Sequence, residues 1–80
     1  MAKLKFNRLI NVTLQPNQTT TIPKNEVWRF SAYNASRSYV VINGTELDVK
    51  SLNGWISEGA TFKGHSYPLQ IEGIAFKVVE

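Results

Sequence analysis

The sequence predicts an all-β protein: a small antiparallel β-sandwich, jelly-roll-like, with about eight short strands and essentially no helix. The pair Asn43-Gly44 lies between two β-branched runs, and this pair adopts the two positive φ angles of a type I′ hairpin turn at least cost. Turn residues recur about every 8 to 12 residues, which is typical of a sandwich or a small barrel. No window places apolar residues at helical spacing beside a cap. We therefore expect residues 1–80 to form a single β-sandwich domain.

The first predicted strand region spans residues 4–14. A row of apolar residues falls on even positions, namely Leu4, Phe6, Ile10, Val12 and Leu14. A period of two is typical of a half-buried strand, in which the apolar row faces the core. Arg8 interrupts the row. We therefore favour two strands joined by a bend near Arg8, in preference to one long strand.

The next elements are two turns, each followed by a strand. A turn at residues 15–18 leads to a short strand at residues 19–22, and a second turn at residues 23–26 leads to a strand at Val27–Tyr33. In that second strand Trp28, Phe30 and Ala32 alternate toward the core.

The Asn43-Gly44 turn also predicts the register of its hairpin. Counting outward from the turn pairs Ile42 with Thr45 and Val40 with Leu47, and these residues are predicted to face the core. Two further sets follow from the same count: Ser38 pairs with Val49 on the core face, and the opposite face carries Tyr39, Val41, Glu46 and Asp48.

The last part of the chain alternates loops with short strands. We expect a loop at residues 51–54, a very short strand at 55–56, a turn at 57–59, a strand at 60–63 and a loop at 64–68. In the final strands the apolar positions change from odd, at Leu69 and Ile71, to even, beginning at Ile74. Gly73 at this change predicts a β-bulge or a sharp bend.

One core is predicted to hold Trp28, Phe30, Val40, Leu47, Ile71, Phe76 and Val78.

Composition excludes several kinds of site and sets an expectation about stability. The chain has no Cys, so it has no disulfide, zinc-thiolate site or cysteine nucleophile. No run approaches the about 18 to 20 apolar residues of a membrane span, and the first ten residues are too polar for a signal peptide, so we expect synthesis in a cytoplasm. A chain of this size buries only about 60 to 65% of its unfolded surface, so we expect association to add stability.

The residues give no support to an enzyme. His65 is the single histidine, and no neighbouring motif supplies an activated nucleophile or an oxyanion site. Scattered carboxylates lack the spacing of a metal site, and each glycine stands alone at a turn instead of in a phosphate-binding loop. We predict no catalytic residues, no cofactor and no metal.

Two surface groups remain as candidate contacts. The net charge is +3, and Lys3, Lys5 and Arg8 are the one cluster of cations, which we interpret as a solvated strand face in preference to a phosphate-contacting arm. Nucleic acid is therefore disfavoured as a partner. A further group comprises Tyr33, Tyr39 and Tyr67, whose rings suit a protein interface or the stacking of sugars.

Four segments, taken in order, resemble a small β-module found in virion proteins of tailed and related bacteriophages. In that pattern a β-branched residue and Pro precede a turn and an aromatic strand, and an Asn-Gly hairpin follows. Trp-aliphatic-x-x-Gly and a closing Gly-aliphatic-x-aromatic strand complete it. Asn25 stands where the family usually has Gly, and Asn also tolerates the left-handed conformation. The matching segments are Thr20–Phe30, Tyr39–Thr45, Trp55–Phe62 and Ile71–Val79.

The resemblance implies a non-enzymatic structural component of a phage particle: a capsid-decorating, spike or penton-associated, or tail-attached subunit located in the virion. Its expected partners are copies of itself, in a closed assembly such as a trimer, and a larger virion protein. The first strand, with Lys3, Lys5 and Arg8, is the predicted contact with neighbouring subunits. The alternative is a carbohydrate-binding module that recognises host glycans through Tyr33, Tyr39 or Tyr67, and a nucleic-acid-binding barrel is third.

Overall fold

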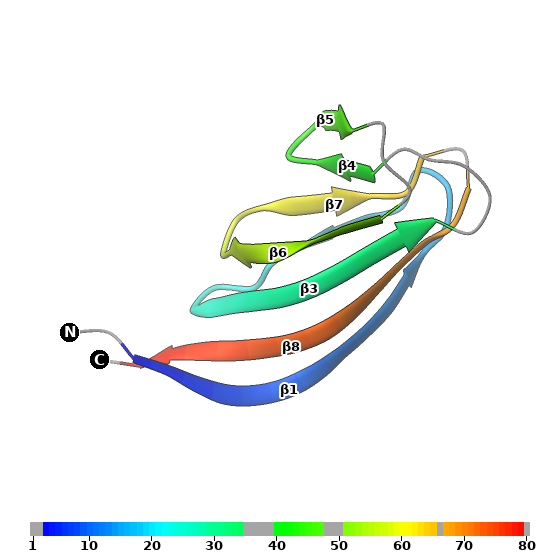
Figure 1. Cartoon of the computed structure of the whole chain (residues 1–80). Helices are drawn as coiled ribbons and strands as arrows, with labels where there is room; N and C mark the ends of the chain where they lie inside the picture. The colour runs from blue at the N-terminus through cyan, green and yellow to red at the C-terminus, as the bar shows by residue number, and fades with distance from the viewer. Residues whose placement is uncertain (1–2, 35–39, 48–50, 66, 80) are drawn as a thin grey trace.

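The computed structural model describes residues 3–34, 40–47, 51–65 and 67–79, and these residues form strands and turns without any helix (Figure 1). Eight antiparallel strands make two four-stranded sheets, which confirms the predicted β-sandwich. The strands are β1 Lys3–Leu14, β2 Thr19–Thr21, β3 Glu26–Asn34, β4 Val40–Ile42, β5 Thr45–Leu47, β6 Ser51–Ser57, β7 Thr61–Lys63 and β8 Leu69–Val79.

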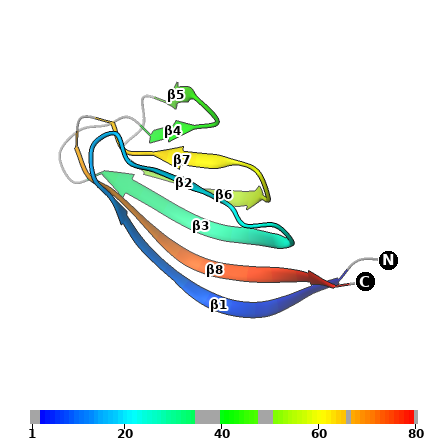
Figure 2. The same ribbon diagram turned by 180° about the vertical axis from the view of Figure 1, so that it is seen from behind.

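The two sheets differ in length. The long sheet has the order β1-β8-β3-β6 and the short sheet has the order β2-β7-β4-β5, which together are the strand order of an eight-stranded jelly roll. Each strand of the short sheet has three residues, whereas β1 has 12 and β8 has 11. β1 and β8 therefore project beyond the short sheet, at the end where both chain termini lie (Figures 1 and 2).

The core lies between the sheets. Phe62 of β7 is fully buried; its ring stacks on Trp28 at 6.3 Å and meets the edge of Phe30 at 4.9 Å. The core predictions for Trp28, Phe30, Val40 and Ile71 are confirmed, whereas the prediction for Leu47 is wrong, because Leu47 is only half-buried and lies outside this core. The complete set of buried core residues is Ile10, Leu14, Ile22, Trp28, Phe30, Ala32, Val40, Phe62, Leu69, Ile71 and Ala75.

The hairpin forms with the predicted register, but the predicted faces are wrong for Val41 and for Thr45, which is exposed. Val40 pairs with Leu47 and Ile42 with Thr45, and the turn residues Asn43 and Gly44 have φ angles of 52° and 79°. Val41 was expected to face outward but is only 6% exposed. The loops that contain Pro16 and Gly64 lie beside it, so Val41 forms the floor of a hollow and not an open surface. The predictions for Ser38, Tyr39, Asp48 and Val49 lie outside the described residues.

The predicted bend near Arg8 is a β-bulge within one continuous strand. Phe6 pairs with Phe76 and Arg8 pairs with Ala75, so Asn7 is an extra residue in β1. The extra residue exchanges the two faces of the strand. Ile10 and Leu14 face the core as predicted, whereas the prediction that Leu4 and Phe6 share this face is wrong.

Two predictions for the later strands are also wrong. Residues 51–54 are not a loop, because they pair with β3 and belong to the seven-residue strand β6. There is no bulge at Gly73, because its register continues toward both β1 and β3. Leu69, Ile71 and Ala75 keep the odd positions on the core face, so Phe76 and Val78 lie on the opposite face of the long sheet and outside the core.

Gly73 has a different structural role, which is a close approach between two strands. Its φ angle is 155°, and a Cβ atom at this position would lie 2.0 Å from the carbonyl oxygen of Arg29. Glycine is therefore required there by both conformation and space.

Candidate interaction face

The most distinctive surface of the molecule is the outer face of the long sheet, meaning the face turned away from the short sheet. Its half nearest the chain termini is apolar and draws on all four strands. The side chains of this apolar patch, by the register and alternation of the strands, are Leu4, Phe6, Leu9, Val27, Trp55, Ile74, Phe76 and Val78.

The register places these side chains in rows across the sheet. Phe6 lies opposite Phe76, which lies opposite Val27. The ring of Trp55 stacks on that of Phe76, with 5.6 Å between centroids. The bulge at Asn7 makes the apolar patch continuous along β1, because it brings even-numbered Phe6 and odd-numbered Leu9 to the same face.

The patch is unusually open to solvent. Four of its large side chains are highly exposed: Leu4 by 48%, Phe6 by 59%, Leu9 by 72% and Trp55 by 58%. A monomeric soluble protein rarely leaves apolar surface of more than a few hundred Å² in one contiguous patch. Aromatic residues are also enriched at the centres of protein interfaces. The outer face is therefore suited to contact with another macromolecule.

A hollow of about 330 Å³ borders the patch on the side farther from the chain termini. Arg29 and Glu72 stand at this hollow, and small residues such as Ser31 and Gly73 leave it open. Neither Arg29 nor Glu72 forms an ion pair with another described residue. Beyond the hollow the outer face is polar, where Gln70 bonds with the side chains of Asn11 and Thr13.

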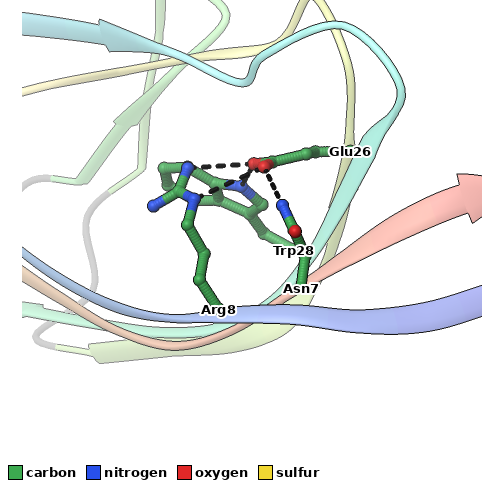
Figure 3. Close-up of polar contacts among 4 residues, drawn as sticks. All are labelled: Asn7, Arg8, Glu26 and Trp28. Atoms are coloured by element: carbon green, nitrogen blue, oxygen red, sulfur yellow. Dashed lines mark hydrogen bonds and ion pairs between the residues drawn. The ribbon is translucent and has the colours of Figure 1, made fainter.

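Beneath the patch, the bulge is fastened to β3 by a buried carboxylate (Figure 3). Glu26 accepts hydrogen bonds from Asn7 Nδ2 at 2.8 Å, from the Arg8 guanidinium at 3.0 and 3.4 Å, and from Trp28 Nε1 at 2.8 Å. The Arg8 guanidinium also lies over the Trp28 ring, 5.6 Å from its centroid. Because consecutive residues Asn7 and Arg8 bind the same carboxylate, this cluster fixes the bulge that turns Phe6 and Leu9 outward.

The charge of Glu26 is stabilised in this cluster. Burial by itself raises the pKa of the Glu26 carboxyl, but the hydrogen bonds from Trp28, Arg8 and Asn7 and the positive charge of Arg8 outweigh that effect. The net result is a pKa below the ordinary value. The cluster is a structural ion pair that joins the bulge in β1 to β3.

The cations predicted to contact neighbouring subunits do not lie on the outer face. Arg8 is engaged with Glu26, and the register places Lys5 on the inner face, opposite Lys77 and in the same row as Glu26. Lys3 lies two residues earlier on the same side. Their role as an interface stays a prediction, and the apolar residues between them are the stronger candidates.

Tyr33 and Tyr67 are separated from the apolar patch. Tyr33 lies on the polar half of the outer face, opposite Gln70, and Tyr67 lies in the loop before Pro68; both are about two-fifths exposed, at 40% and 43%. Neither residue lines the hollow beside Arg29 or the hollow beside Val41. Tyr39 lies outside the described residues. Glycan binding by these residues stays a prediction.

A second hollow, of about 410 Å³, lies at the short sheet between Val41, Lys63 and the loop at Gly64. At its rim His65 Nε2 lies 3.1 Å from Glu46 Oε1, a pairing that the sequence did not indicate. The described lining residues include no hydroxyl or thiol nucleophile. In the described part of the chain, no group of three or more acidic, histidine or cysteine side chains is placed to hold a metal ion.

No protein-family model, curated protein or solved structure matches the chain. Among the described residues no helix is long and apolar enough to cross a membrane. The features that inform function are therefore the jelly-roll topology and the chemistry of the surfaces, above all the apolar patch. One signal of this patch was overlooked in the sequence: Leu9 occupies an odd position within an otherwise even-numbered apolar row.

Proposed function

We propose that this chain is a non-enzymatic structural subunit of a bacteriophage particle that works through protein–protein contacts. It would decorate a capsid, associate with a spike or penton, or attach to a tail. The observation that supports contact as its mode of action is the apolar patch, where Phe6, Leu9 and Trp55 are each more than half exposed.

The fold and the resemblance support the setting of this contact. Jelly rolls recur in viral capsid proteins and also in lectins, although a fold by itself does not determine a function. The resemblance of four segments to phage virion modules favours the particle. The proposed partners are copies of the same chain and a larger virion protein, and a closed trimer remains the prediction for its free sheet edges.

Glycan binding is the alternative, and it rests on the exposure of Tyr33 and Tyr67 on a fold that lectins also use. The two functions depend on different parts of the surface. The apolar patch serves the first, and Tyr33 on the polar half of the same face serves the second.

Mass spectrometry of particles purified from the chain's source tests the proposal, and we expect the chain to be present at a fixed ratio to the major shell protein. Added Phe6→Ser protein should then fail to bind particles that lack the chain, whereas Tyr33→Ser should bind them normally. Absence of the chain from the particle would contradict the virion proposal. Glycan-array binding that is lost in Tyr33→Ser would favour the alternative.

A further inference from the structure

We infer that the outer face of the long sheet pairs with the same face of a second copy about a twofold axis, with Arg29 of each copy facing Glu72 of the other. The inference builds on the proposed function, because it names one of the partners of the apolar patch. It specifies how two copies are arranged and which two ion pairs join them, whereas the proposed function states only that the patch makes protein contacts.

The charges of the outer face are self-complementary. In the apolar half and at its border, the charged residues are one cation, Arg29, and one anion, Glu72, on the neighbouring strands β3 and β8. Both are exposed, and neither has an ionic partner among the described residues. In a twofold interface residue i meets residue j while j meets i, so a single pair of opposite charges yields two intermolecular ion pairs.

The distribution of charge over the rest of the surface favours a second copy over an acidic partner at the outer face. The chain carries a net charge of +3. Where β1 and β8 project beyond the short sheet, Lys3, Lys5 and Lys77 lie on the inner face of the long sheet. An acidic partner is therefore attracted to the inner face. The outer face is electrically balanced, so a second cationic copy can approach it without a net charge penalty.

The order of the strands is compatible with a twofold axis that runs parallel to the strands between β8 and β3. These two strands lie at the centre of the order β1-β8-β3-β6, so the axis places β8 of one copy over β3 of the other, and β1 over β6. Leu9 of one copy then lies over Trp55 of the other, because both residues belong to the row of Ile74 and Arg29. Arg29 and Glu72 of different copies are then offset in plan by two residues along facing strands, about 7 Å, which long side chains span.

The size of the face is sufficient for a stable contact. Four strands spaced about 4.8 Å apart and four rows of side chains along them give an area in plan on the order of 400 to 500 Å². The relief of the side chains increases this area toward the about 800 Å² per partner of a standard interface. Two sheets that pack face to face in this way place their strands within about 30° of each other.

Sedimentation velocity of the full chain at micromolar concentration tests the pairing. We expect an even-numbered assembly, either a dimer or two edge-closed trimers paired face to face. Arg29→Glu and Glu72→Arg should each weaken the pairing by more than about tenfold, because each change creates two like-charge contacts. Lys63→Glu, on the short sheet, makes the same change of charge as Arg29→Glu and should leave association unchanged. Melting curves of the three variants check that all remain folded.

The decisive measurement is a mixture of the two weakened variants. An Arg29→Glu copy and a Glu72→Arg copy present only opposite charges to each other, so the mixture should recover association to within a few-fold of the unchanged chain. An intrachain role for the two residues predicts no recovery. Failure to recover, or an odd-numbered assembly, would overturn the twofold pairing while leaving self-association intact. Recovery in a chain that is absent from particles would uphold the pairing and contradict the virion proposal.

Discussion

The inner and outer faces of the long sheet share the same backbone but differ in how their apolar side chains are covered. Trp28 on the inner face is 2% exposed beneath the short sheet, whereas Trp55 on the outer face is 58% exposed. Both rings stack on a phenylalanine, Trp28 on Phe62 and Trp55 on Phe76. The difference shows that ring stacking alone does not bury a tryptophan. A further layer of protein over the outer face would bury Trp55, as the short sheet buries Trp28.

The comparison of the two tryptophans predicts the largest effect. Trp28→Ala should lower the free energy of unfolding by about 3 to 5 kcal/mol, because it opens a cavity between the sheets. Trp55→Ala should cost about 1 kcal/mol, since it removes one ring contact at the surface. Urea denaturation of the dilute monomer measures both values. Equal losses for the two variants would show that the two faces are equally buried in solution.

Two glycines of the long sheet give a second comparison. Gly73→Ala should destabilise the fold by about 1 to 3 kcal/mol or more, because of the φ angle of 155° and the clash with the Arg29 carbonyl. Gly54→Ala in β6 is the control, since a Cβ there would lie 3.7 Å from the Phe30 ring, an ordinary contact. Thermal unfolding measures both variants. An unchanged melting temperature for Gly73→Ala would contradict the close approach of β3 and β8.

The Glu26 cluster predicts a pH-dependent contribution to stability. The folded-state pKa of Glu26 lies below its ordinary value of about 4.3, so the carboxylate stabilises the fold above that pH and the contribution is lost as the pH falls through the folded-state pKa. Glu26→Gln should cost about 1 to 3 kcal/mol at pH 7, because buried donors lose their charged acceptor.

The difference between Glu26→Gln and the unchanged chain should shrink as the pH falls through the lowered folded-state pKa of Glu26, where the carboxylate of the unchanged chain becomes protonated. Urea midpoints at pH 7, 5 and 3 measure this trend. Glu72→Gln, measured in the dilute monomer, is the control, because Glu72 is exposed there and has no ionic partner among the described residues. A constant difference across this range would contradict the contribution of the Glu26 charge.

Features that depend on adjacent residues could be predicted from the sequence. The Asn43-Gly44 turn fixes its own register, and the alternation of Trp28 and Phe30 identifies the core side of β3 without knowledge of the neighbouring strands. The jelly-roll class followed from the number and spacing of such local signals.

Features that depend on distant partners could not be predicted in this way. The bulge at Asn7 is stabilised by Glu26, 19 residues away, and nothing near Asn7 in the sequence indicates that carboxylate. Without the bulge, Leu4 and Phe6 continue the inward row of Ile10, and the apolar patch disappears from the prediction. Asn53 and Gly54 favour a loop locally, but pairing with β3 overrides that preference in β6.

The smallest expected effect on stability is the most informative about function. Phe6→Ser should change the free energy of unfolding of the isolated chain by within about 0.5 kcal/mol, because Phe6 is mostly exposed and projects away from the core. The same substitution should remove self-association, since it takes a large aromatic ring from the apolar patch. Phe62→Ser, at the centre of the core, should instead unfold the chain. Sedimentation and urea denaturation of the two variants therefore separate the faces: a Phe6→Ser protein that loses stability but keeps its association would place Phe6 in the core and contradict the outer face as an interface.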